Sequence, residues 1–347
     1  MIRKIWTRRT FLLLFSAIFA FTSVAFFGCK DPNEPDDPPT PPGPVDPDPP
    51  IINPDAVPGN KKLVFIHHST GGYLLADDNG ELAKKLTVSG FYVSDICYEW
   101  DAPQNHDIGS TTDIGSWYTW FADVTQQSNG VARRDNIMNA VYAEFDKDSY
   151  NSSNFGSYTR AATAPEGANE VVLLKSCYPN SNIENSGSQS IFGKEHNDAT
   201  YTVANCQAVY EAILPYFKDH PDKMFVVITA PSRPGNSGVI TSQEAANART
   251  LNNWLVNEWL QNADYVNKNV YVWDYFNVLT NANNHHYVVD GAVRHETVSG
   301  SGNYTINAYD LDGQGHPNTA GSSKGATELT QCINLWYSVW RSWVTEE

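Results

Sequence analysis

Basic residues are scarce in this sequence. It has 23 lysines and arginines against 39 aspartates and glutamates, which gives a formal net charge of −16. A protein that binds nucleic acid needs a stripe of positive charge to neutralise phosphates, and no such stripe is present. We therefore expect no nucleic-acid partner, and the excess of acid is typical of a solvated surface.

Cysteine is also scarce, with five residues in the chain. Cys29 belongs to the N-terminal segment, which leaves Cys97, Cys177, Cys206 and Cys332 in the body. An even number of cysteines in an exported protein allows several disulfide pairings, and buried free thiols are the alternative. None of the cysteines forms a C-x-x-C pair, so we expect no zinc site built on cysteine.

Long apolar runs are limited to one, from Phe11 to Phe27, which is slightly shorter than the ~20 residues of a membrane-spanning helix. It follows a basic start and precedes Gly28, as in an export signal. The segment Ala25–Cys29 resembles a bacterial lipobox, in which the cysteine is lipidated and becomes the new N-terminus. We therefore expect residues 1–29 to be a lipoprotein signal peptide lipidated at Cys29, with a membrane-spanning anchor as the alternative.

The export route and the segment after Cys29 indicate where the protein is expected to be located. Thr7–Leu12 resembles a twin-arginine motif, and the general secretory route is the alternative. Residues 30–60 are rich in proline and acid, so they cannot bury apolar surface and are predicted to form a disordered tether. Asp31 and Glu34 resemble the signals of some surface lipoproteins. We expect a bacterial outer-membrane lipoprotein, attached through its N-terminal lipid and facing the periplasm or the cell surface.

The body, residues 61–347, is predicted to be one folded domain. The chain is 41% hydrophobic and 12% aromatic, which is enough for a core. Strand-like and helix-like segments alternate, which predicts an α/β fold with three layers, α/β/α, and a mainly parallel sheet. The predicted strands are Leu63–Ile66, Phe91–Tyr98, Val171–Lys175, Met224–Ala230 and Val270–Asp274. The predicted helices are a stretch ending near Gly90, Asp135–Asp146, Ala204–Phe217, Gln243–Asn262 and Ala320–Trp343.

The first predicted strand leads directly into residues 67–72, with the sequence HHSTGG. The carboxyl ends of strands in an open parallel sheet collect ligands and reacting groups. The two glycines allow a sharp turn that points the Ser69 hydroxyl outwards. Ser69 is thus a candidate nucleophile, and an ordinary turn in which Ser69 or Thr70 caps the next helix is the alternative.

A second polar group, Asp310, Asp312 and His316, lies before the last amphipathic segment. A serine nucleophile needs a base such as histidine, and the base needs an acid to orient it. This order, with serine early and aspartate and histidine late, resembles the SGNH (GDSL-like) hydrolase superfamily, whose serine follows the first strand and whose D-x-x-H motif closes the domain. The resemblance implies an SGNH/flavodoxin-like fold and a serine esterase.

The motifs depart from the superfamily pattern in two places. His67-His68-Ser69 replaces G-D-S, so the chain resembles an atypical branch with HHSTG, and Asp312 lies one residue further from His316 than in D-x-x-H. The serine and the histidine therefore carry over better than the aspartate. The catalytic candidates are Ser69 and His316, with Asp312 as the orienting acid and Asp310 as its alternative.

Acyl transfer also needs donors for the negative charge that develops on the carbonyl oxygen. In the superfamily these are the serine's own N–H, a glycine after the second strand and an asparagine after the third. The resemblance implies Ser69, Gly109 and Asn180 as the oxyanion hole. Alternatives in the same two loops, each equally compatible with an ordinary turn, are Gly115, Ser176 and Asn182.

The histidines offer a different chemistry. A zinc-dependent hydrolase is the alternative that would use His67, His68, His285, His286 and His316. Adjacent histidines at a strand end point to opposite faces, so at most one of the first two shares a site with Ser69. We expect neither a metal nor a cofactor.

The substrate is expected to be an acylated polysaccharide or oligosaccharide. The envelope address and the resemblance imply a carbohydrate acetyl or acyl esterase. Aromatic side chains near the second strand can stack on sugars or pack in the core: Trp100, Trp117, Tyr118 and Trp120. Asn277–Asn307 is too long for a simple connection and is expected to form a rim or lid. The alternative function is a surface glycan-binding lipoprotein that keeps the fold without catalysis.

Overall fold

The computed structural model describes residues 61–100, 112–122, 127–128, 131–187, 201–234, 240–298, 306–311 and 315–346. The predicted signal peptide, the tether and Cys29 lie outside these residues, as do Gly109 and Asp312. No helix within the described ranges is both long and apolar enough to cross a bilayer.

A five-stranded sheet forms the centre of the domain, as predicted. Its strands run in the order β2-β1-β5-β6-β7, and every neighbouring pair is parallel. The strands are short apolar runs buried on both faces, which is the pattern typical of a covered parallel sheet. Their bounds are β1 Lys61–Ile66, β2 Phe91–Ile96, β5 Val171–Lys175, β6 Met224–Ile228 and β7 Val270–Trp273.

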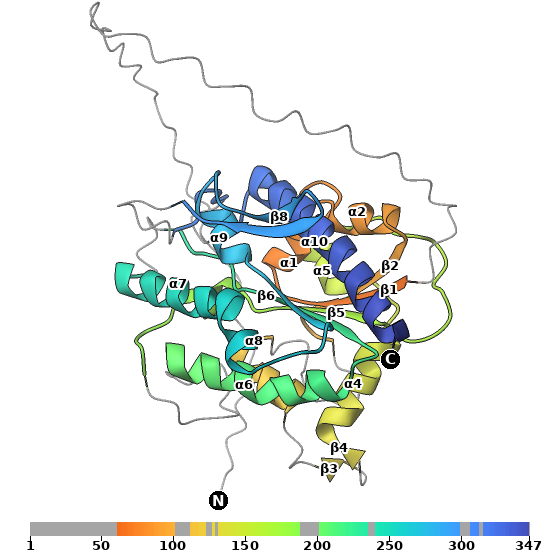
Figure 1. The fold of residues 1–347 in the computed structure, drawn as a ribbon. Coiled ribbons are helices and arrows are strands. Elements are labelled where there is room, and N and C mark those ends of the chain that lie inside the picture. Colours follow the sequence, from red (N-terminus) through yellow and green to blue (C-terminus); the bar gives the residue numbers. More distant parts are fainter. Residues whose placement is uncertain are drawn as a thin grey trace, which may run out of the picture. The chain divides into compact units, whose positions relative to one another are not determined.

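Alternate side chains of each strand enter two separate cores, because successive strand residues point to opposite faces. In β1, Val64 and Ile66 belong to one hydrophobic cluster, and Leu63 and Phe65 to the other. The first core is covered by α3 Ile114–Phe121, α4 Arg133–Ala143, α6 Val203–Asp219, α7 Ser242–Asn257 and α8 Trp259–Asn262. The second is covered by α1 Thr70–Leu75, α2 Leu82–Val88, α9 Tyr275–Thr280 and α10 Thr319–Glu346. Figure 1 shows α1, α2, α9 and α10 above the sheet and α4, α6 and α8 below it, so the three-layer prediction is confirmed.

Several elements differ from the predicted ones. The predicted helix Gln243–Asn262 is two helices separated at Glu258, although its start has the expected capping box between Thr241 and Glu244. The stretch after β1 also divides, into α1 and α2. Elements that were not predicted are α3, α5 Ser149–Asn154, the 3₁₀ turn Tyr178–Ser181, and the strand pairs β3 Gln127–Ser128 with β4 Val131–Ala132 and β8 His285–Val289 with β9 Ala292–Glu296.

The edge strand β2 is buried along its whole length. The segment after α4 covers it, and Asp95 N–H donates to the carbonyl of Asp146 at 3.3 Å. The Ser94 hydroxyl lies 3.2 Å from the carbonyls of Leu63 and Glu144. An uncovered edge presents unpaired backbone groups to other chains, so this segment closes one side of the sheet.

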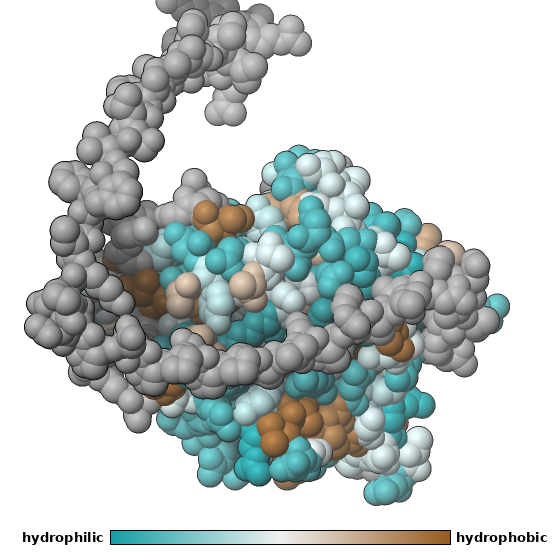
Figure 2. Space-filling view, turned by 90° about the horizontal axis from the view of Figure 1, so that it is seen from above, coloured by the Kyte–Doolittle hydropathy of each residue, from teal (hydrophilic) through white to brown (hydrophobic). Residues whose placement is uncertain are grey.

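The outer surface and the thiols complete the description. Figure 2 shows one face on which the coloured atoms are mostly hydrophilic, with a few hydrophobic patches. Among the described residues, the most exposed large apolar side chain is Val266, at 71%. Cys97, Cys177, Cys206 and Cys332 are all buried free thiols, so the body has no disulfide among the described cysteines.

Part of the segment expected to form a rim is a hairpin that packs against α10. Its turn is Asp290-Gly291, and both residues have positive φ, as in a two-residue hairpin turn. Buried polar contacts at the end of β7 hold the hairpin in place. His295 Nε2 lies 2.8 Å from Asp274 Oδ2, and the Asp274 N–H donates to His286 Nδ1 at 2.9 Å.

The same contacts make the stability of the fold dependent on pH. Burial lowers the pKa of His286 to about 3, and His295 adds to this effect, whereas Asp274 opposes it. The unfolded chain binds a proton at this histidine near pH 6.5, but the folded chain does not. The free energy of unfolding should therefore fall by about 1.4 kcal/mol for each pH unit below 6.5 on account of His286.

Replacing His286 tests this expectation. His286→Asn keeps an acceptor for the Asp274 N–H but cannot titrate. Urea unfolding of wild type and variant between pH 7 and 5 should show the stability of the variant falling less steeply, by about one proton. Parallel stability curves would show that His286 is not the titrating group.

Candidate active site

The strand order creates a topological switch point between β1 and β5. The chain leaves β1 towards β2 on one side, whereas β5 lies on the other side of β1. Such a topological switch point is where open parallel sheets bind ligands, outside the carboxyl ends of the strands. Ser69 follows β1 and Cys177 follows β5, and their side chains meet there, with Oγ and Sγ 3.1 Å apart. Both are 4% exposed.

Ser69 occupies a sharp turn between β1 and α1. Its φ of 23° lies in the left-handed region, which is strained for a residue other than glycine. It stands at the N-cap position, but its side chain makes no capping hydrogen bond, so the alternative interpretation as an ordinary helix cap is not supported. A Cβ at Gly71 would lie 2.5 Å from His67 Cβ, and therefore the close turn requires glycine at this position.

His316 comes to the same helix from the far end of the sequence. An isolated bridge joins Asp310 to Pro317, and the Leu311 N–H donates to the His316 carbonyl at 2.8 Å. The His316 ring lies 5.4 Å from the Tyr73 ring, edge to face. The Tyr73 N–H in turn donates to the Ser69 carbonyl at 3.2 Å. The structure thus brings His316 to the first turn after Ser69.

Of the two candidate acids for orienting His316, Asp310 lies within the described residues. Asp312 lies outside the described residues. Asp310 is half-buried, and its Oδ1 accepts a hydrogen bond of 3.3 Å from the N–H of Gly315, the residue before His316. The assignment of Asp312, or of Asp310 in its place, as the orienting acid remains a prediction.

The residues around His67 form a buried polar network behind the serine. His67 Nε2 lies 3.2 Å from Asp95 Oδ2, and neither side chain is exposed to solvent. Asp95 Oδ1 accepts hydrogen bonds from the Tyr158 hydroxyl at 2.6 Å and from the Asp148 N–H at 2.8 Å. The carboxylate therefore has three donors, which is what a buried charge requires. This network ties β1, β2 and the start of α5 together.

The loop after β5 uses its predicted donors for other contacts. Asn180 Oδ1 accepts from the Ile114 N–H at 2.8 Å, and its Nδ2 donates to Asp113 at the start of α3. The alternatives are engaged as well, since Ser176 Oγ accepts from Trp117 Nε1 at 3.0 Å and Asn182 Oδ1 accepts from Arg233 at 3.0 Å. Asn180 has one further amide proton, and its role in an oxyanion hole remains a prediction.

Sequence reasoning missed Cys177 as the residue of this loop that reaches Ser69. The SGNH superfamily that the sequence resembles has a G-x-N-D block after its third strand. Aligning Lys175-Ser176-Cys177 with the first three positions of that block puts Cys177, rather than Asn180, in the place of the asparagine.

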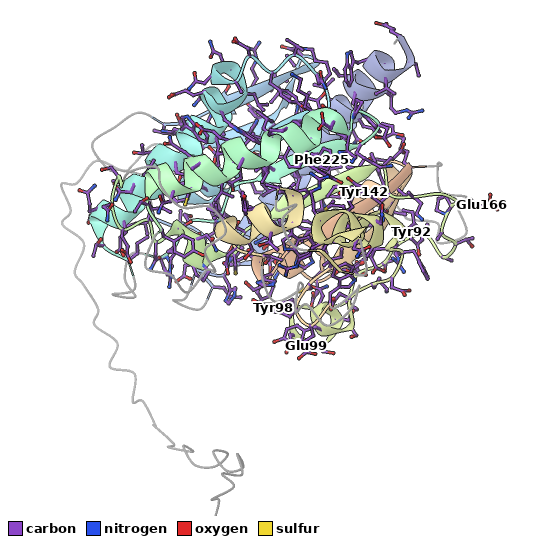
Figure 3. All side chains as sticks on the ribbon, turned by 90° about the horizontal axis from the view of Figure 1, so that it is seen from below. Tyr92, Tyr98, Glu99, Tyr142, Glu166 and Phe225 are labelled. Carbon is purple, nitrogen blue, oxygen red and sulfur yellow. The ribbon has the colours of Figure 1, made fainter. Side chains whose placement is uncertain are left out.

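A cleft of about 420 Å³ lies at the end of β2, and neither Ser69 nor His316 is among the residues that line it. Tyr98 lies between the cleft and Ser69. It lines the cleft, and its ring stacks on His68, the residue before Ser69, with centroids 3.8 Å apart. Burial raises the pKa of the Tyr98 phenol, and the nearby Ser69 side chain opposes that rise. Figure 3 shows Tyr98 and Glu99 side by side at one margin of the domain. The cleft is lined by Asp95, Tyr98, Glu99, Trp100, Glu144, Asp146, Lys147, Asp148, Ser149 and Tyr150.

Only some of the aromatic candidates are available to a ligand. Trp117 and Trp120 are 1% and 0% exposed and belong to the core, so stacking on a sugar is excluded for both in this conformation. Trp100 and Tyr118 are partly buried against that core. Trp100 lines the cleft, and its Nε1 donates to Glu144 Oε2 at 2.7 Å.

The alternative prediction was a zinc site shared by several histidines. In the structure these histidines contact different partners. His67 contacts Asp95, His285 Nδ1 lies 2.7 Å from Glu328 Oε1, and His286 accepts from the Asp274 N–H. Among the residues that the structure describes, no three or more histidine, cysteine, aspartate or glutamate side chains are grouped as metal ligands.

Comparisons with known proteins give two distant likenesses. No protein-family model matches the chain, and no curated protein matches it. A protein designated a candidate acylhydrolase, from Bacteroides fragilis NCTC 9343, is 12% identical with a TM-score of 0.39, over 81% of this chain and 92% of the other. A carbohydrate esterase family 2 enzyme with a carbohydrate binding domain, from Corynascus thermopiles (Myceliophthora fergusii), is 14% identical with a TM-score of 0.37, over 82% of this chain and 68% of the other. Neither likeness bears on the activity of this chain.

The buried network behind Ser69 should be a strong stabilising element. Tyr158→Phe removes one donor to the Asp95 carboxylate, and hydrogen bonds to charged groups contribute roughly 1.5–3 kcal/mol. Tyr142→Phe is a matched control, because it removes a buried hydroxyl whose partner, the Tyr216 hydroxyl at 2.9 Å, is neutral. Urea unfolding at pH 7 should show the larger loss for Tyr158→Phe. A loss no greater than that of the control would mean that Asp95 is not held as a charged acceptor.

Proposed function

We propose that the protein is an exported, lipid-anchored serine esterase of the SGNH type, from an atypical branch with HHSTG, which removes acetyl or other acyl groups from carbohydrate. The observation that carries the proposal is the meeting of two distant segments. Ser69 lies in a strained turn at the switch point of the sheet, and the His316 ring packs against Tyr73 of the helix that begins there. A nucleophile and a base need this kind of proximity.

In the proposed mechanism Ser69 Oγ attacks the ester carbonyl carbon while its proton passes to His316. His316 then gives the proton to the leaving alcohol, and water releases the acyl group by the same two steps. Asp312, or Asp310 in its place, orients the imidazole. The Ser69 N–H, Gly109 and Asn180 are the proposed donors to the oxyanion.

The Ser69 hydroxyl must change its partner for this chemistry. Its hydrogen bond in the structure joins it to the Cys177 thiol. Hydrogen bonds between catalytic groups are often formed only when substrate is bound, so this contact is compatible with the mechanism. A thiol is also a weak partner, which the hydroxyl can leave at small cost.

The cleft at the end of β2 supports carbohydrate as the substrate. Tyr98, Trp100 and Tyr150 offer aromatic surface, and the carboxylates of its lining accept hydrogen bonds from sugar hydroxyls. Five acidic side chains against the single Lys147 give this lining a negative potential. The substrate is therefore proposed to be a neutral acylated saccharide rather than a polyuronate.

A non-catalytic glycan-binding lipoprotein on the same fold is the second candidate. It is favoured by one observation, the engagement of the Ser69 hydroxyl with Cys177 rather than with a base. Binding of acylated glycans without any turnover that depends on Ser69 would identify this function.

Hydrolysis of p-nitrophenyl acetate by the purified full chain tests the esterase. Ser69→Ala and His316→Ala should each lower kcat by at least about 10³-fold, because members of a catalytic triad act as a unit. The double variant should lose little more than either single one. Ser338→Ala, at an exposed position on α10, is the control and should keep the wild-type rate.

The rates of the variants decide between the candidates. Equal hydrolysis by wild type and Ser69→Ala would remove Ser69 from the mechanism. Absence of activity in the wild type on p-nitrophenyl acetate and on acetylated xylo- and gluco-oligosaccharides alike would favour the binding protein.

A further inference from the structure

Lys175, the last residue of β5, is a lysine with no exposure to solvent at the switch point of the sheet. Its Nζ donates to the Thr70 hydroxyl oxygen at 2.7 Å and to the Ser176 carbonyl at 2.9 Å. These two acceptors are the neighbours of Ser69 and Cys177, the pair whose side chains meet. A single ammonium group therefore joins the loop after β1 to the loop after β5.

The ammonium is held at a considerable energetic cost. Within the described residues no carboxylate lies at ion-pair distance from it, and an unpaired buried charge typically costs several kcal/mol. The charged or titratable groups that face it are the thiols of Cys97 and Cys177 and the carboxylate of Asp113. Burial lowers the pKa of Lys175 to about 8, and these three groups act in the opposite direction. The lysine is consequently still mostly protonated at neutral pH.

A structural role alone does not explain the choice of lysine. Thr70 and the Ser176 carbonyl need only a neutral donor, and a neutral donor avoids the cost of burying a charge. The charge lies beside the strained turn of Ser69, where the φ of 23° must be maintained. A serine esterase also develops negative charge close to its nucleophile, and Ser69 is the residue before Thr70, to which Lys175 donates.

We propose that Lys175 is a positioning residue of the Ser69 site, which fixes the turn of the nucleophile through Thr70 and adds a buried positive charge next to the developing oxyanion. This inference rests on the proposed esterase function. During the reaction Ser69 Oγ forms the bond to the carbonyl carbon and its proton goes to His316, whereas Lys175 keeps all its protons. The geometry argues against Lys175 as the base, because its Nζ donates to Thr70 and not to Ser69.

The two roles predict opposite pH dependence. A cation that must stay protonated makes kcat/KM fall as the pH rises through about 8, whereas a lysine base makes it rise over the same range. The wild type should therefore show a descending limb near pH 8. Lys175→Met should lose about 10²-fold or more in kcat at pH 7, with little change in KM, and should lack that limb. Lys175→Arg, which keeps the charge, should recover part of the rate.

Lys62→Met is the matched control. Lys62 is a lysine that is 5% exposed at the opposite end of β1, and its Nζ donates to the Gly167 carbonyl at 2.7 Å. Burial lowers its pKa as well. This variant should keep the wild-type kcat and the wild-type pH profile. Thr70→Val is the second variant, for use if Lys175→Met fails to fold. It breaks the link while leaving Lys175 in place, and should lower kcat by about tenfold.

The experiment measures p-nitrophenyl acetate hydrolysis from pH 6 to 9.5 and the rate at which a fluorophosphonate labels Ser69, with Ser69→Ala as the blank. Lys175→Met with the wild-type kcat, labelling rate and pH profile would refute the role of Lys175 while leaving the esterase intact. A wild-type rate that rises through pH 8 would refute it in favour of a lysine base. Turnover by Ser69→Ala equal to that of the wild type would refute the esterase itself, and with it this role of the lysine.

Discussion

The parallel pairing of β1 with both β2 and β5 is the constraint on which the rest of the structure depends. β1 is apolar on both faces, so helices must cover both sides of the sheet. The chain then leaves β1 and β5 in different directions, and their carboxyl ends remain uncovered by any direct connection between them. Polar residues at the ends of these two strands and directly after them converge at this point. Ser69 and Lys175 belong to this set because of the strand order, although 106 positions separate them.

Buried polar groups at this point are paired with one another across strands. Asp95 has three donors, and Lys175 has two acceptors, so neither charge is left without hydrogen bonds. His67 Nδ1 is the exception, since it is buried and has no hydrogen-bond partner. Nε2 faces the Asp95 carboxylate, so the network fixes the orientation of the His67 ring and leaves Nδ1 as a buried ring nitrogen next to the nucleophile turn.

The parts of the fold that could be predicted from the sequence are those with a strong periodic signal. β1, β5 and β6 are continuous apolar runs, and the start of α7 has its capping box, so their placement follows from local chemistry. The β8–β9 hairpin was missed although Asp290-Gly291 is a typical turn signal, because the flanking residues are half-polar. α3 was missed although its buried apolar residues, Ile114, Trp117, Trp120 and Phe121, recur at the spacing of a helix face.

The site was predictable only to the level of segments. The loop after β1 and the loop before α10 were identified because their residue types suit acyl transfer, and the structure brings Ser69 and His316 to the same helix. The register of the G-x-N-D block was a usable signal for Cys177 as the side chain that reaches the serine, but the direction of Asn180 depends on the turn Tyr178–Ser181, which was not predicted. The turn directs Asn180 towards α3 and leaves Cys177 at the serine.

Cys177 changes the electrostatics that an esterase at this site needs. The resemblance assigns an asparagine to this loop, and its amide would be a good donor to an oxyanion, whereas a thiol is a weak one. With Cys177 in that place, and with the Asn180 side chain bonded to Ile114 and Asp113, the same charge needs positive potential in addition to the proposed donors. A fully buried ammonium adjoining both loops provides it, since a charge in a low-dielectric environment acts over a longer distance than a single amide dipole. The weak donor at Cys177 and the costly charge at Lys175 are therefore most simply understood as parts of one arrangement.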